Sequence, residues 1–333
     1  MSVEELIDEI KGQLRPVNIV SFSGGKDSTM VLSLVIEALK DQPDKRLIVL
    51  TADTLIEIPY YAEYVRRITE RLRDYFATSF PQGSVVVTTP EVKQRFFYRT
   101  LGLGYPAPFM KFRWCTGGLK VDPIFNFQKT LNEDYKVFIG VRQVESKERA
   151  ERYKKKDFLP KHFAPILFLE NIAVWEYLLI EECVWGGDHK ELIEVYRFAS
   201  DECIYGLKEG VCVGNARYGC WICPLQRNNQ LDLIAHYTKD SRYQLLKYYK
   251  NQYARMSENP AHRSNVRRNG ESGQGPFILS ARQILFHELQ KLEQMTGWTF
   301  CDAEQEAAIY EAWENDDGLY EIPVIDDLQL SLW

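Results

Sequence analysis

The chain has 333 residues, of which 45% are hydrophobic and 26% are charged, and its formal net charge is −6. This length allows one large or two ordinary domains with a buried core, and the composition excludes a disordered or low-complexity protein. No stretch approaches about 18 uncharged apolar residues, and the first residues lack the apolar segment of a signal peptide. The sequence therefore predicts a cytoplasmic protein without a membrane partner.

Charge and cysteine content narrow the chemistry. A net charge of −6 argues against a surface that coats nucleic acid throughout, although it allows a local basic groove. The chain has seven cysteines. In a reducing compartment we expect these thiols to serve metal or sulfur chemistry rather than disulfides.

The first half of the chain alternates short apolar runs with helical patterns. Strands are predicted at 17–21, 47–51, 85–88 and 137–141, and helices at 29–39 and 60–76. Such alternation predicts an α/β fold with a parallel sheet covered on both faces, in which ligands bind at the carboxyl ends of the strands. We assign residues 1–165 to this domain.

The pattern changes after about residue 163. Helices are predicted at 171–183, 231–256 and 280–295, the last with a capping box of Ser280 and Gln283 and an end at Gly297. Residues 195–223 look irregular and are rich in Gly and Cys, and 259–276, rich in Arg and Gly, look like a mobile loop. We expect a second, mainly helical, cysteine-bearing domain over 166–333.

Residues 21–28, Ser-Phe-Ser-Gly-Gly-Lys-Asp-Ser, lie between the first predicted strand and the first predicted helix. The backbone N–H groups of Gly24 and Gly25 at a helix N-terminus would make an anion cradle. Lys26 would add a mobile positive charge, and the hydroxyls of Ser23 and Ser28 would add donors. The alternative is a Gly-Gly turn that binds no ligand.

This loop is not a Walker loop, which needs Gly where Val20 stands and Ser or Thr where Asp27 stands. Asp27 has the wrong sign for a phosphate contact, so a Mg²⁺ contact fits it better. The string Ser-Gly-Gly-Lys-Asp-Ser instead resembles the PP-loop ATP pyrophosphatases, which cleave ATP between the α- and β-phosphates. The resemblance implies an adenine nucleotide alpha-hydrolase-like fold of the HUP type. It also implies an ATP and Mg²⁺ site formed by Ser21, Ser23, Gly24, Gly25, Lys26, Asp27 and Ser28.

Two later segments are similar to the phosphoadenylylsulfate (PAPS) reductase family. Asp53-Thr54 begins a D-T-x-x-x-x-P element at the end of the second predicted strand, with Leu55 in place of the usual Gly. This similarity implies that Asp53 and Thr54 lie beside the nucleotide. Residues 113–116, Arg-Trp-Cys-Thr, are similar to the R-x-C-T string of the same superfamily. There Cys115 is either a sulfur carrier near the nucleotide or a packing residue.

Gly140-Val-Arg142, followed by Arg149, resembles the G-x-R-x-x-E loop of the same family. Arg142 and Arg149 could neutralise an α-phosphate or a leaving pyrophosphate, where negative charge develops. The alternative is a surface ion-pair run, since residues 145–156 alternate Glu with Lys and Arg.

Four cysteines in the second half have the spacing C-x8-C-x7-C-x2-C. Four thiolates with one close pair can hold a [4Fe–4S] cluster or a structural zinc ion, and spacing alone barely separates the two. Buried free cysteines are the third possibility. The candidate metal ligands are Cys203, Cys212, Cys220 and Cys223.

The residues around these cysteines, 212–223 and then 275–282, closely resemble the PAPS-reductase-like component of bacterial DNA phosphorothioation systems of the Dnd or Ssp type. The resemblance covers about residues 17–292 and favours an iron–sulfur cluster over zinc. It implies an ATP pyrophosphatase that helps to place sulfur on the DNA backbone. The implied partners are DNA, a cysteine desulfurase or other sulfur donor, and other subunits of the modification complex.

The implied reaction has two steps. A non-bridging phosphate oxygen of DNA attacks the α-phosphorus of ATP and pyrophosphate leaves; sulfur then displaces AMP. Positive charge is needed because two anionic phosphates must meet. The residues assigned to catalysis are Lys26, Asp27, Arg142 and Cys115.

DNA contacts would come from local basic patches, each of which can equally be a solvated face. We favour the loop that contains Arg263, Arg267 and Arg268, because its glycines would let it close over a DNA backbone. The patches are Arg66, Arg67, Arg71 and Arg73; residues 154–156; and Arg263, Arg267 and Arg268.

Three other functions compete. A sulfonucleotide reductase or a sulfate adenylyltransferase subunit would act on small sulfur nucleotides, but the late E-C-G-x-H element of the reductases does not match Thr-Phe-Cys-Asp-Ala around Cys301. A tRNA thiolase shares the PP-loop but usually has a different cysteine layout. A non-catalytic DNA-binding scaffold has no need for an intact Ser-Gly-Gly-Lys-Asp-Ser loop.

Overall fold

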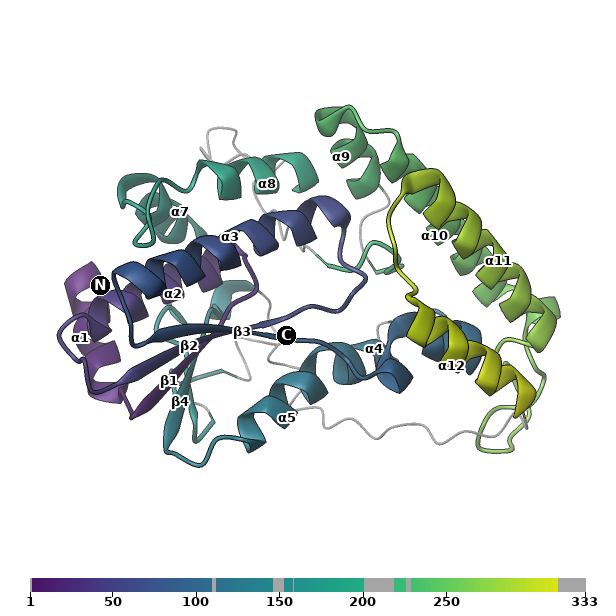
Figure 1. Cartoon of the computed structure of the whole chain (residues 1–333), viewed down its shortest axis with the longest axis horizontal. Coiled ribbons are helices and arrows are strands. Elements are labelled where there is room, and N and C mark those ends of the chain that lie inside the picture. The colour runs from purple at the N-terminus through teal and green to yellow at the C-terminus, as the bar shows by residue number, and fades with distance from the viewer. Residues whose placement is uncertain are drawn as a thin grey trace.

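The computed structural model describes residues 2–109, 112–145, 153–157, 159–200, 219–225 and 229–316. Its first half contains a five-stranded parallel sheet in the order β3-β2-β1-β4-β5 (Figure 1). The four predicted strands are confirmed, with small shifts at their ends. The short fifth strand was not predicted. The strands are β1 Val17–Ser21, β2 Arg46–Ala52, β3 Gly83–Thr88, β4 Tyr135–Ile139 and β5 His162–Phe163.

The central strands are buried on both faces, which explains their continuous apolar runs. Side chains alternate between two cores: Ile48 and Leu50 of β2 enter one, and Leu47 and Val49 enter the other. The larger core includes α1 Val3–Gln13, α2 Lys26–Leu39, α3 Pro59–Thr78 and α7 Asn171–Ile180. On the opposite face lies α5 Asp122–Lys129 (Figure 1).

The strand order determines where a ligand crevice lies. The chain runs from β1 outward to β2 and β3, then returns across the sheet to β4 on the other side of β1. The connections after β1 and β4 therefore leave the sheet in opposite directions. In open parallel sheets this switch point, at the carboxyl ends of the strands, is where ligands bind.

A connecting region leads from the sheet to the C-terminal helices. It contains the π-helical turns Tyr98–Gly102 and Gly117–Val121, and between them the short α4 Trp114–Thr116. The C-terminal helices pack on this region, where the indole Nε1 of Trp313 donates to the carbonyl of Leu101 at 2.7 Å. Short 3-10 helices lie at Val92–Gln94, Gln143–Glu145 and Pro260–His262.

In the part of the chain described after residue 229, α-helices alternate with loops, the longest of which runs over 263–278. Two predictions there are wrong in detail. The single helix expected over 231–256 is two helices, α9 Gln230–Thr238 and α10 Arg242–Glu258, because Lys239 adopts a left-handed conformation (φ +56°) that ends α9. The capping box of Ser280 and Gln283 is absent, since α11 Leu279–Thr296 already begins one residue earlier without a side-chain cap.

Two helices of the second half, α8 Lys190–Ser200 and α12 Ala303–Glu314, were not predicted. The region expected to be irregular from 195 onward begins inside α8, and 201–218 fall outside the described residues. Gly297 ends α11 as expected, with φ +73°. Within the described ranges, none of the helices combines the length and apolar character that a membrane crossing requires.

Candidate active site

The loop after β1 is held in shape by hydroxyl groups. Gly24 has φ +77°, a conformation that favours glycine. The Ser28 hydroxyl donates to the carbonyl of Gly25 at 2.9 Å and accepts from the Ser23 amide at 3.3 Å. Because α2 begins at Lys26, the amides that follow belong to the N-terminus of a 14-residue helix. This end of a helix attracts anions.

The loop after β4 lies directly against this helix N-terminus. A Cβ atom at Gly140 would come within 2.6 Å of the Ser28 amide nitrogen and 2.7 Å of the Asp27 carbonyl carbon. These are backbone atoms, which cannot move aside as the end of a flexible side chain can. Gly140 is therefore needed for the two loops to meet at the switch point.

Arg142 links the two loops through its side chain. Its Nε donates to Asp27 Oδ1 at 2.5 Å, and its Nη2 donates to Asn171 Oδ1 at 3.1 Å. The structure thus brings together Lys26, Asp27 and Arg142, which the sequence analysis assigned to catalysis. Arg149 lies outside the described residues.

Lys26 is held rather than mobile, unlike our expectation. It is only 5% exposed, and its Nζ lies 3.6 Å from Asp27 Oδ2. Two aromatic rings flank the ammonium group, with Nζ 4.9 Å from the ring centre of Tyr196 and 5.8 Å from that of Trp175. Such ring faces attract cations. The buried aromatic partners were missed because they lie about 150 residues or more away in sequence.

The segment after β2 turns sharply beside the sheet edge. The Asp53 carboxylate accepts from the Leu55 amide at 2.8 Å, and Leu55 has φ +64°. This left-handed conformation explains physically why glycine suits the position. The Thr54 amide donates to Glu57 Oε2 at 3.1 Å. Burial, with a contribution from Asp53, raises the pKa of Glu57 to about 7, although Lys120 opposes the shift.

The Cys220–Cys223 turn is attached to this segment. Its amides and carbonyls pair with the segment's backbone, from Trp221 N to Ile56 O at 3.0 Å and from Ile58 N to Gly219 O at 3.3 Å. The Thr54 hydroxyl lies 3.7 Å from Cys220 Sγ. The cysteine pair predicted as metal ligands therefore lies beside the predicted nucleotide segment.

Cys115 joins the same neighbourhood from α4. Its thiol interacts electrostatically with those of Cys220 and Cys223. Burial raises the pKa of Cys115 to about 11 and that of Cys220 further, while Lys120 lowers both. Lys250 interacts with Cys223. Cationic side chains around clustered thiols suit a metal group, whose ligands must be thiolates.

The remaining predicted metal ligands, Cys203 and Cys212, lie outside the described residues. Among the residues that are described, no set of three His, Cys, Asp or Glu side chains is arranged to hold a metal ion. The structure thus brings half of the predicted ligand set to one place, together with a third cysteine that the sequence analysis had considered as a sulfur carrier.

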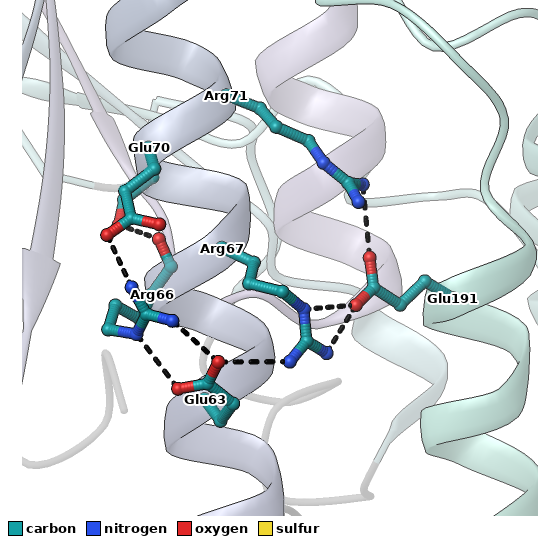
Figure 2. Close-up of polar contacts among 7 residues, drawn as sticks. Glu63, Arg66, Arg67, Glu70, Arg71 and Glu191 are labelled. Atoms are coloured by element: carbon teal, nitrogen blue, oxygen red, sulfur yellow. Dashed lines mark hydrogen bonds and ion pairs between the residues drawn. The ribbon is translucent and has the colours of Figure 1, made fainter.

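Three arginines of the first basic patch are paired with carboxylates (Figure 2). Arg67 Nε and Arg71 Nη1 lie 2.7 Å and 3.0 Å from the two oxygens of Glu191, which belongs to α8. These pairs tie α3 to α8. Arg66 instead pairs within α3, with Glu63 and Glu70.

Several charged side chains of the other two basic patches also form ion pairs or hydrogen bonds within the protein. Lys156 pairs with Glu9, and Lys154 and Lys155 are exposed. In the Arg- and Gly-rich loop, Arg263 donates to backbone carbonyls, including that of Ser257 at 2.7 Å. Arg268 bonds the Leu103 carbonyl, and Arg267 pairs with Glu271 at 3.5 Å. This loop therefore folds back on the protein in the structure.

Residues 17–185, just over half of the chain, match the phosphoadenosine phosphosulfate reductase domain family. The chain belongs to this family. Two relatives are uncharacterized proteins of Methanocaldococcus jannaschii. MJ0066 is 26% identical over 225 residues, covering 66% of this chain and 38% of its own. MJ0973 is 25% identical over 215 residues, covering 62% and 41%. The chain thus spans about two fifths of the length of these curated relatives.

Similarity to solved structures is weak. FMN adenylyltransferase of Candida glabrata in complex with ATP aligns with a TM-score of 0.35 and 15% identity, over 60% of this chain and 59% of that one. The U34-tRNA thiolase NcsA of Methanococcus maripaludis with its [4Fe-4S] cluster aligns with a TM-score of 0.32 and 13% identity, over 77% and 80%. Similarity at this level identifies no substrate for this chain.

Proposed function

We propose that this chain is an ATP pyrophosphatase that adenylylates a phosphate of the DNA backbone and so prepares it for sulfur incorporation. The observation that carries the proposal is the meeting of the loops after β1 and β4. There Lys26, Asp27 and Arg142 form one chain of contacts at the N-terminus of α2. Membership of the PAPS reductase family supports the same chemistry.

In the first step, a non-bridging oxygen of the DNA phosphate bonds to the α-phosphorus of ATP. The bond between the α-phosphorus and its bridging oxygen breaks, and pyrophosphate leaves with the electron pair. Both reactants are anionic, so the helix N-terminus, Lys26 and Arg142 lower the barrier by offsetting negative charge. Oxygen ligands suit Mg²⁺, and the carboxylate of Asp27 and the hydroxyl of Ser28 are the groups that would hold it.

In the second step, the terminal sulfur of a persulfide, supplied by a cysteine desulfurase or another donor, bonds to the activated phosphorus, and AMP leaves with the electron pair. A thiol reductant then supplies the two electrons that cleave the S–S bond, so that the sulfur stays on phosphorus and the donor thiolate is regenerated. Cys220 and Cys223, with Cys203 and Cys212, are the proposed ligands of a [4Fe–4S] cluster, with zinc as the weaker alternative. The cluster would supply a sulfide-containing, redox-active group. Cys115 is the proposed sulfur carrier, which is supported by its place beside the Cys220–Cys223 turn.

The first step can be tested with the purified, metal-loaded protein. ATP labelled at the α-phosphate is supplied with duplex DNA, and pyrophosphate release and label on DNA are measured. We expect Arg142→Ala to reduce both by about 100-fold or more, because it removes a positive charge that lies beside the phosphate loop through its contact with Asp27. Arg46→Ala, which removes an exposed arginine at the amino end of β2, away from the phosphate loop, is the matched control and should retain both activities.

The substrate class follows from what stimulates pyrophosphate release. Stimulation by duplex DNA supports the proposal. Stimulation by tRNA or by sulfate, with no response to DNA, would overturn it in favour of a thiolase or a sulfate adenylyltransferase subunit.

The sulfur step is best tested in the host cell. DNA and tRNA from cells with the intact gene, a deletion and a Cys220→Ser variant are digested with nuclease and analysed by mass spectrometry. We expect sulfur-bridged dinucleotides in the DNA of the intact strain and their loss in both mutants. Sulfur linkages that persist in the deletion would exclude this function.

A further inference from the structure

The phosphate loop is covered by a residue of α8. The amide of Lys26 donates to the hydroxyl of Tyr196 at 3.1 Å. A Cβ atom at Gly25 would lie 3.2 Å from the same oxygen, so the hydroxyl rests closely on the loop. Tyr196 is only 4% exposed. A protein oxygen therefore occupies an amide of the helix N-terminus to which phosphate oxygens are attracted.

The ring of Tyr196 also engages the side chain of Lys26. The ammonium lies over this ring and near that of Trp175. The two rings themselves meet edge to face, with centres 5.0 Å apart at 89°. Tyr196 thus occupies two phosphate-binding groups of the loop at once: the Lys26 amide through its hydroxyl and the Lys26 ammonium through its ring face.

The helix that carries Tyr196 is docked partly by polar contacts. Glu191, five residues before Tyr196, binds Arg67 and Arg71 of α3 (Figure 2). The arginine side chains are 35% and 48% exposed, so these pairs are open to solvent and salt. Exposed ion pairs stabilise weakly. The docking of α8 on α3 thus has a salt-sensitive polar part beside the apolar packing of Leu192 and Val195, which are buried in the core.

We propose that Tyr196 belongs to the nucleotide site, where its hydroxyl and a phosphate oxygen compete for the Lys26 amide. A phosphate oxygen is charged, and hydrogen bonds to charged acceptors are roughly twice as strong as those to neutral ones. Phosphate therefore displaces the hydroxyl when nucleotide binds. The same displacement removes the ring from Lys26 and releases its ammonium toward the phosphates. This inference rests on the proposed function only in taking the loop as a phosphate site.

Tyr196→Phe separates the two contacts, because it removes the hydroxyl and keeps the ring. We expect the dissociation constants for inorganic pyrophosphate and for ATP, measured by titration calorimetry, to fall about threefold to tenfold, since the ligand no longer displaces a hydrogen bond. Tyr310→Phe removes a half-exposed hydroxyl on α12 and is the matched control, with unchanged constants. Circular dichroism establishes that both variants fold.

A weaker or unchanged affinity in Tyr196→Phe would overturn the inference, because the hydroxyl would then be a phosphate ligand or a bystander. So would a wild-type protein that binds neither pyrophosphate nor ATP. If pyrophosphate binds more tightly to Tyr196→Phe but DNA never stimulates ATP cleavage, the inference stands and the proposed function fails.

A second measurement follows the Tyr196 ring directly and keeps its hydroxyl in place. The intact chain is labelled with 3-fluorotyrosine at position 196, and its fluorine resonance is followed while pyrophosphate is added. We expect the resonance to move to the position of a solvent-exposed tyrosine. A resonance that stays in place as pyrophosphate binds would show that the ring remains on the loop.

Discussion

At the scale of single residues, the active-site geometry depends on the absence of a side chain at Gly140. The hydrogen there points at the backbone of Asp27 and Ser28. We expect Gly140→Ala to lower the free energy of unfolding by about 1–3 kcal/mol, the range for overpacking, and to abolish ATP binding, because the loops after β1 and β4 must separate. Chemical denaturation and calorimetry measure the two effects.

Gly12→Ala is the control for this substitution. No described atom lies within 4 Å of a Cβ at this position in α1. We expect this variant to keep the wild-type free energy of unfolding or to gain up to about 1 kcal/mol, since alanine is favoured over glycine in a helix and Gly12 lies in the last turn of α1. Equal losses in the two variants would show that the tight contact at Gly140 is unimportant.

Cys115 gives a second prediction at this scale. If Cys115 carries sulfur, Cys115→Ser should reduce sulfur incorporation into DNA at least about tenfold more than it reduces pyrophosphate release, because the two steps use different groups. Both are measured on the same DNA. Cys183→Ala, at a buried cysteine between α7 and α8, should change neither sulfur incorporation nor pyrophosphate release. Parallel losses in Cys115→Ser would assign Cys115 to packing.

At the scale of elements, part of the docking of α8 on α3 depends on partly exposed ion pairs. We expect Glu191→Gln to lower the free energy of unfolding by at most about 1 kcal/mol at low salt, because its arginine partners are partly exposed. The difference from wild type should vanish near 1 M salt, where the screening length falls to about 3 Å. Thermal denaturation across a salt series measures it.

Glu194→Gln on the same helix is the matched control, since Glu194 is exposed and carries the same charge. It should show no comparable dependence on salt. A loss in Glu191→Gln that persists at high salt would mean that Glu191 acts through packing or hydrogen bonding rather than charge.

Elements with a strong local pattern could be predicted from the sequence. The runs that became β1 and β2 are largely apolar because both sheet faces are covered. By contrast, β5 has two residues, too few to show a pattern. In α8, Leu192, Val195 and Tyr196 do have helical spacing, but the Gly- and Cys-rich residues that follow obscured the start of the helix.

At the scale of the whole molecule, the candidate site could be predicted only in part. The phosphate loop and Gly140–Arg142 are local strings, and the rule that ligands bind at strand ends places them together. The association of Cys115 with Cys220, and of Tyr196 with Lys26, joins positions more than 100 residues apart. The periodicity of hydrophobic residues does not reveal such contacts, because they arise from how separate elements pack.

The stability of the whole molecule should depend on pH through His162 in β5. Burial, with a contribution from Lys136, lowers the pKa of His162 to about 4, against about 6.5 in an unfolded chain. Between these values the unfolded chain binds a proton that the folded chain does not. The free energy of unfolding therefore falls as the pH falls from about 6.5 to 4, by up to about 1.4 kcal/mol per pH unit from this group.

Other groups also titrate between about pH 6.5 and 4. The test therefore compares how steeply the free energy of unfolding changes with pH in each variant. Burial also lowers the pKa of His189, which contributes in the same direction. His162→Gln should flatten the pH dependence by up to one proton, whereas His287→Gln, at an exposed position on α11, should leave the wild-type slope. Urea denaturation at several pH values measures both. Identical slopes in His162→Gln and wild type would mean that His162 is protonated in the folded protein, and that β5 does not bury its ring.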